Sequence, residues 1–74
     1  MNDDLIKKAI AANIEALSAQ LSDCSLLSSE AFQAIQQGEL NQAIGTILDF
    51  DRKLGDALAL YRAAVALHRT GRAP

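Results

Sequence analysis

The side chains most often used to bind soft metals or attack a substrate are scarce in this sequence: histidine and cysteine each occur once, as His68 and Cys24. A zinc site needs about four ligands, and a cysteine nucleophile needs a nearby base and a positively charged setting. Cys24 instead follows the acid Asp23. We therefore predict no metal site, interpret Cys24 as a small buried thiol, and interpret His68 as a charge near a helix end.

Carboxylates are more frequent, and paired carboxylates can perform acid–base chemistry when they share a surface. Asp49 and Asp51 are two residues apart, so on a helix they point to different sides. We expect Asp49 to pair with Lys53, four residues later. Three interpretations of Asp51 stay open: an ion pair with another segment, a polar group that fixes packing register, or an exposed side chain. The sequence predicts no catalytic or cofactor site and no enzyme.

The C-terminal half, from Gly38 to Gly71, has the clearest helical pattern. Its apolar residues recur at alternating steps of four and three, which is typical of one helix face and close to a coiled-coil seam. These residues are Leu40, Ile44, Ile47, Leu54, Leu58, Tyr61 and Val65. The pattern predicts one long helix with this face packed inward, and a kink near Gly55 stays open. Gly38 suits the left-handed position that ends a preceding helix.

The N-terminal half predicts a helix from about Asp3, with an inward face of Ile6, Ile10, Ile14, Leu17 and Leu21. Residues 22–29 are rich in serine, which favours caps and turns because its hydroxyl competes for backbone hydrogen bonds. We favour a break here, with Ser28 capping a second helix over 29–37. The alternative is one unbroken helix, because an apolar stripe continues through Cys24 and Leu27 to Ile35.

Composition sets the fold class. The chain of 74 residues is 50% hydrophobic but only 4% aromatic, so its core must be built from Ala, Leu and Ile, which favour helix. We predict a single all-α domain over 1–74, a small antiparallel helical bundle with one long C-terminal helix. It has three helices if the break at 22–29 exists, and it is a two-helix hairpin otherwise.

Charge and hydropathy limit the partners. The net charge is −2 and the pI about 5.1, which argues against nucleic acid or an anionic membrane as a partner. No apolar run approaches the roughly 18 residues of a membrane span. The first residues are acidic where a signal peptide needs bases, and a single cysteine suits a reducing compartment. We expect a cytoplasmic protein.

The segment from Leu58 to Leu67 is apolar nearly all round, with only Arg62 polar. A helix apolar on all sides is buried on all sides, and the N-terminal half can cover only one. We therefore predict an interface for a second copy, as a dimer, or for a partner helix. Its residues are Leu60, Ala63 and Leu67, flanked by Ala59 and Ala66. The expected function is a non-enzymatic, self-associating protein–protein interaction module, such as an adaptor, small chaperone or regulatory subunit. The alternative is a small nucleic-acid-associated regulator.

Overall fold

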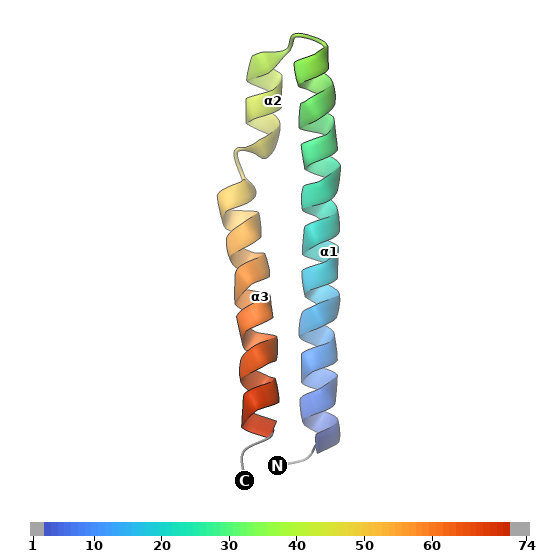
Figure 1. Ribbon diagram of the computed structural model, residues 1–74, viewed down its shortest axis with the longest axis vertical. Coiled ribbons are helices and arrows are strands. Elements are labelled where there is room, and N and C mark those ends of the chain that lie inside the picture. The colour runs from blue at the N-terminus through green and yellow to red at the C-terminus, as the bar shows by residue number, and fades with distance from the viewer. Residues whose placement is uncertain (1–2, 72–74) are drawn as a thin grey trace.

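The computed structural model describes residues 3–71, which form three helices and, within that range, no strand. The helices are α1 (Asp3–Gln36), α2 (Leu40–Ile47) and α3 (Phe50–Gly71). α1 forms one arm of a hairpin, and α2 and α3, placed end to end, form the antiparallel second arm (Figure 1). The all-α antiparallel prediction is confirmed, in its hairpin form.

α1 runs without interruption through residues 22–29, so the favoured break is wrong. Ser28 lies inside the helix, where its hydroxyl donates to the backbone oxygen of Ser25 at 2.9 Å, and it caps no new helix. A serine in a helix interior costs at most about 0.7 kcal/mol relative to alanine. Packing against the second arm outweighs that local preference.

The turn between the arms depends on Gly38, which has a φ of +77°. The amide of Gly38 donates to the oxygen of Ile35 at 3.0 Å, and the amide of Glu39 donates to that of Ala34 at 2.8 Å. This pair of bonds is the Schellman motif, which ends a helix with a left-handed residue. The role predicted for Gly38 is confirmed.

The second arm is interrupted at residues 48–49 and not at Gly55, which lies inside α3. Leu48 keeps helical angles, with φ −59° and ψ −28°, and the amide of Lys53 donates to the oxygen of Asp49 at 3.1 Å. An acid here favours a new helix start because it complements the positive end of the helix dipole. The predicted long C-terminal helix is therefore two segments in line (Figure 1).

The two arms meet along a row of buried and half-buried residues in each, which we call the inter-arm contact. In α1 the row is Ile6, Ile10, Asn13, Leu17, Gln20, Cys24, Leu27, Ala31 and Ala34. In the second arm it is Ala43, Lys53, Ala57, Leu60, Ala64 and Leu67. The spacing alternates between three and four within each helix, as in a coiled-coil seam. The residues that are fully buried, apart from Ile6, are alanines and Cys24.

This contact reverses the predicted orientation of α3. Leu54, Leu58 and Tyr61 were expected inside, yet they are 47%, 44% and 54% exposed. Leu60 and Leu67, expected outside, are half-buried. Small side chains let helix axes approach closely, so the alanine-containing stripe, and not the stripe of large residues, lies against α1.

Candidate interaction surface

The exposed large side chains of the two arms gather on one side of the hairpin. Ile14 and Leu21 each follow a residue of the inter-arm contact, as do Leu54 and Tyr61. One further residue along an α-helix turns the side chain by about 100°. Because the arms are both right-handed and run in opposite directions, that rotation brings all four side chains to the same side.

We call this surface the apolar face. Its residues are Ile14, Leu21, Phe32 and Ile35 of α1, Leu40, Ile44 and Ile47 of α2, and Leu54, Leu58 and Tyr61 of α3. Their exposed fractions range from 36% at Ile47 to 63% at Phe32. Among residues 3–71, these are all the exposed large apolar side chains except Leu5, Leu26 and Leu48. The apolar face therefore extends along both arms.

The apolar face is layered, because the two arms are held in one register. The side-chain amide of Gln20 donates to the backbone oxygen of Lys53 at 3.1 Å and Lys53 Nζ bonds Asp23, so the segment around Leu21 lies beside the segment around Leu54. Steps of seven residues along each antiparallel arm give the other layers. They pair Ile14 with Tyr61, Ser28 with Ile47, and Ile35 with Leu40.

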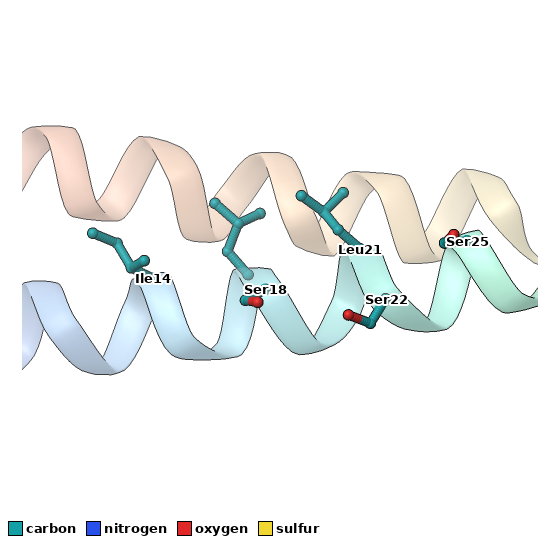
Figure 2. A pocket seen from close by; sticks show the side chains of 6 residues that line it. Ile14, Ser18, Leu21, Ser22 and Ser25 are labelled. Carbon is teal, nitrogen blue, oxygen red and sulfur yellow. The ribbon is translucent and has the colours of Figure 1, made fainter.

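A shallow groove on α1 lies within this surface, lined by Ile14, Leu17, Ser18, Leu21, Ser22 and Ser25. Figure 2 shows Ile14 and Leu21 projecting toward the second arm, with the serines along α1 beside them. The serines are small, so the surface of α1 is hollowed between its larger side chains. Such a surface can receive side chains from another helix, as knobs enter holes in a coiled coil.

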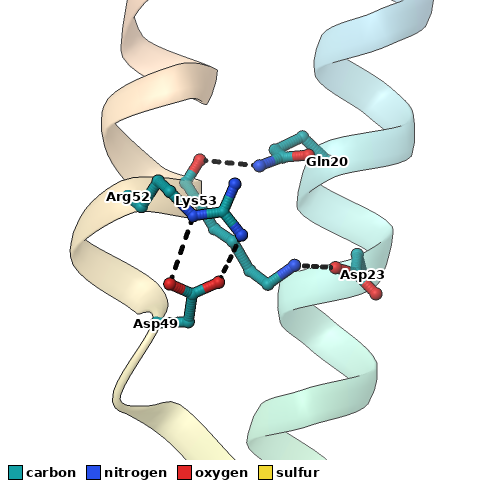
Figure 3. A network of polar contacts seen from close by, with 5 residues as sticks. All are labelled: Gln20, Asp23, Asp49, Arg52 and Lys53. Atoms are coloured by element: carbon teal, nitrogen blue, oxygen red, sulfur yellow. Dashed lines mark hydrogen bonds and ion pairs between the residues drawn. The ribbon is translucent and has the colours of Figure 1, made fainter.

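On the other side of the inter-arm contact, charged residues such as Asp23, Arg52 and Asp56 lie among alanines. Lys53 Nζ lies 2.6 Å from an oxygen of Asp23 (Figure 3), and this hydrogen bond raises the pKa of Lys53. Arg52 Nε donates to Asp49 at 3.2 Å and Arg52 Nη2 also contacts that carboxylate, which lowers the pKa of Asp49. Asp49 thus pairs with Arg52, and the predicted pairing with Lys53 is wrong.

The structure shows where the residues considered first for chemistry lie. Cys24 is a buried free thiol, as predicted, and Asp51 is exposed, as in the third of its interpretations. Residues 3–71 contain no cluster of three or more His, Cys, Asp or Glu side chains placed to hold a metal ion. No helix in the same range is long and apolar enough to cross a membrane.

The five residues predicted as an interface do not form the apolar face. Leu60, Ala63 and Leu67 are half-buried beside α1, whereas Ala59 and Ala66 are exposed. The apolar face consists instead of residues that the sequence pattern had assigned to the core. The pattern of two apolar stripes on the second arm could be read from the sequence, but not which stripe faces α1.

Comparison with protein-family models gives no match to this chain. Comparisons with curated proteins and with solved structures likewise give no match. The surface must therefore be interpreted from its own residues.

Proposed function

We propose that this chain is a non-enzymatic protein–protein interaction module whose binding surface is the apolar face. The observation that carries the proposal is the set of ten exposed large apolar side chains on one side of both arms. Contiguous apolar patches beyond a few hundred Å² mark interaction sites on soluble proteins. Adaptor, small chaperone and regulatory subunit are roles that such a surface supports.

The shape of the surface favours a protein over a small ligand. Small-molecule sites are concave and enclose most of their ligand, whereas the groove beside Ile14 and Leu21 is shallow and open. A long apolar face made by two helices suits the apolar side of another helix or helix pair. The nucleic-acid alternative has less support, because residues 9–51 carry acids and no lysine or arginine. We also propose a cytoplasmic location, which suits the unpaired thiol of Cys24.

Site-specific photo-crosslinking tests the proposal. A photoreactive phenylalanine analogue in place of Leu54 should give defined protein adducts in the cell that makes the chain. The same analogue in place of Leu26 is the matched control, since Leu26 is 65% exposed but outside the apolar face. Equal adducts at both positions, or none at Leu54, would contradict the proposal. Retention on DNA at about 0.15 M salt would favour the alternative instead, because non-specific nucleic-acid binding is electrostatic.

A further inference from the structure

We propose that a second copy of this chain covers the apolar face, with its hairpin turn at the opposite end, to form an antiparallel four-helix bundle. The inference rests on the proposed function, because it takes the apolar face as the binding surface and names its occupant. Four features of the chain lead to it: the heptad pattern, the exposed area, the weak core and the charge distribution.

The heptad pattern is that of a helix with two neighbours. In each arm, two rows with a period of seven face the other arm, and a third row of the same period lies beside them and faces outward. The outward rows are Ile14, Leu21, Ser28 and Ile35 in α1, and Leu40, Ile47, Leu54 and Tyr61 in the second arm. The inward rows of α1 are Ile10, Leu17, Cys24 and Ala31, and Asn13, Gln20, Leu27 and Ala34, and those of the second arm are Ala43, Ala57 and Ala64, and Lys53, Leu60 and Leu67. A two-helix seam uses two such rows, whereas a core-facing helix of a bundle uses three of every seven positions.

The accessible area indicates how much more surface this chain exposes than a compact monomer of the same mass. The chain exposes 5595 Å², about 1,200 Å² more than the roughly 4,400 Å² expected for a compact monomer of 7.9 kDa. Its radius of gyration is 17.0 Å, against about 11 Å for a compact domain of this length. Two copies that each buried this excess would remove about 2,400 Å², within the range of obligate homodimers.

The weak core of the hairpin favours a second copy over another protein. The buried residues among 3–71 are Ile6, Cys24 and four alanines, and no large side chain in that range is completely buried. Domains this small generally need an additional source of stability, and oligomerisation is one. A stabilising partner must be present whenever the chain is, and a second copy meets that condition by itself.

Charge sets the orientation of the two copies. From residue 9 to residue 51 every charged side chain is acidic, and this segment includes the hairpin turn. Lys7, Lys8 and Arg69 lie at the opposite end, where α1 begins and α3 ends, and they outnumber the acids Asp3 and Asp4 there by one. A two-fold axis perpendicular to the long axis places the acidic end of one copy against the basic end of the other. A two-fold axis parallel to the long axis of the hairpin would bring like ends together, which is electrostatically unfavourable.

The outward rows also fix the position along the hairpin at which the two-fold axis crosses it. Antiparallel overlap of all four layers places it between the Leu21 and Ser28 layers, so that the large Leu21 meets the small Ser28 of the second copy. Ser25 lies on the α1 surface close to this centre (Figure 2). Its counterpart in the second copy is therefore close by, whereas Ser18 and its counterpart are about 20 Å apart along the axis.

Molecular mass tests the presence of the second copy. Sedimentation equilibrium of the full chain at micromolar concentration should give twice the mass of 7.9 kDa. Leu54→Glu should shift the mass to that of a monomer or unfold the chain, since a charge enters the interface, and Leu26→Glu should stay dimeric. A monomeric wild type, or a dimeric Leu54→Glu, would overturn the inference.

Disulfide trapping tests the orientation without weakening the interface. In a Cys24→Ala background, Ser25→Cys should form a covalent dimer under mild oxidation at least ten times faster than Ser18→Cys. Equal rates would indicate random collision and would overturn the antiparallel arrangement, as would failure of Ser25→Cys to cross-link.

The two proposals can fail separately. If the wild type is monomeric while adducts at position 54 contain another protein, the second copy is excluded and the interaction module remains. If adducts at positions 54 and 26 are equal, the proposed function itself is excluded.

Discussion

The inter-arm contact and the apolar face lie side by side, yet the most buried residues of the contact are mostly small, whereas those of the face are all large. Ala57 in the contact is 5% exposed, whereas Leu54, one helical turn earlier, is 47% exposed. Globular monomers usually bury their large apolar side chains first. In this hairpin the buried residues are mostly small, and most large ones are half-buried in the contact or exposed on the face. Most of its capacity for hydrophobic stabilisation, which scales with buried apolar area, is therefore unused within one chain.

The two regions also differ in how they specify geometry. The inter-arm contact contains polar groups that align the arms: Gln20 bonds the backbone of Lys53, and Lys53 bonds Asp23. Such directional contacts select one register. The apolar face relies on the shape and spacing of its side chains. The contact thus sets the structure of the hairpin, and on the proposed function the face would supply the affinity for a partner.

The largest effect is expected from enlarging the inter-arm contact. Ala43 is 2% exposed and packs with Ala31 and Ala34 in a buried cluster. Ala43→Leu should lower the free energy of unfolding by about 1–3 kcal/mol, because the added carbons force the arms apart. Each kcal/mol should lower the Tm by about 4–8 °C in a domain of this size, measured by circular dichroism. An unchanged Tm would show that α2 does not pack closely on α1.

Adding a carbon outside the inter-arm contact should raise the free energy of unfolding instead of lowering it. A Cβ at Gly45 or Gly55 would meet no atom within 4 Å, and both residues lie inside helices. Gly45→Ala and Gly55→Ala should each raise the free energy of unfolding by up to about 1 kcal/mol, since glycine disfavours helix. Thermal melts of Gly45→Ala and Ala43→Leu thus compare two positions in one helix, and loss of stability in Gly45→Ala would contradict the open placement of that site.

Much of the fold could be predicted from local chemistry. The left-handed Gly38, the helical periods and the antiparallel arms follow from residue type and spacing, and each is observed. The break at residues 22–29 was wrong because serine preferences are small and Ser28 satisfies its hydroxyl within α1.

The orientation of the arms could not be predicted in the same way. Ranking stripes by hydrophobicity places Leu54 and Tyr61 inside, but contact between two helices depends on how closely their axes approach. That distance is set by residues of both arms together, such as Ala34 with Ala43. Gln20 and Lys53 are polar residues that occupy positions of the inter-arm contact, one in each arm. They were the available sign in the sequence that this stripe of the second arm faces inward. Their bond joins residues far apart in sequence, so neither arm shows it alone.

A smaller change in Tm should distinguish the contributions of the two ion pairs to stability. The Lys53 side chain is 19% exposed within the contact, whereas the side chains of Arg52 and Asp49 are 66% and 52% exposed. Asp23→Asn should therefore lower the Tm slightly more than Asp49→Asn, because solvent and salt screen an exposed pair. Melts at low and high salt measure the difference, and equal effects would show that the Lys53–Asp23 pair adds nothing to the inter-arm contact.

The smallest effect should be the loss of the Lys53–Asp23 pair at alkaline pH. Its hydrogen bond raises the pKa of Lys53 above the ordinary lysine value of about 10.4. The pair's contribution is therefore fully present below about pH 10.4 and disappears as the pH rises through the raised pKa of Lys53. The Tm difference between the wild type and Lys53→Met should stay constant from neutral pH to that point and change only above it. Because other groups titrate equally in both proteins, this difference isolates Lys53. A difference independent of pH up to about pH 12 would show that Lys53 stabilises the contact through its aliphatic stem and not through its charge.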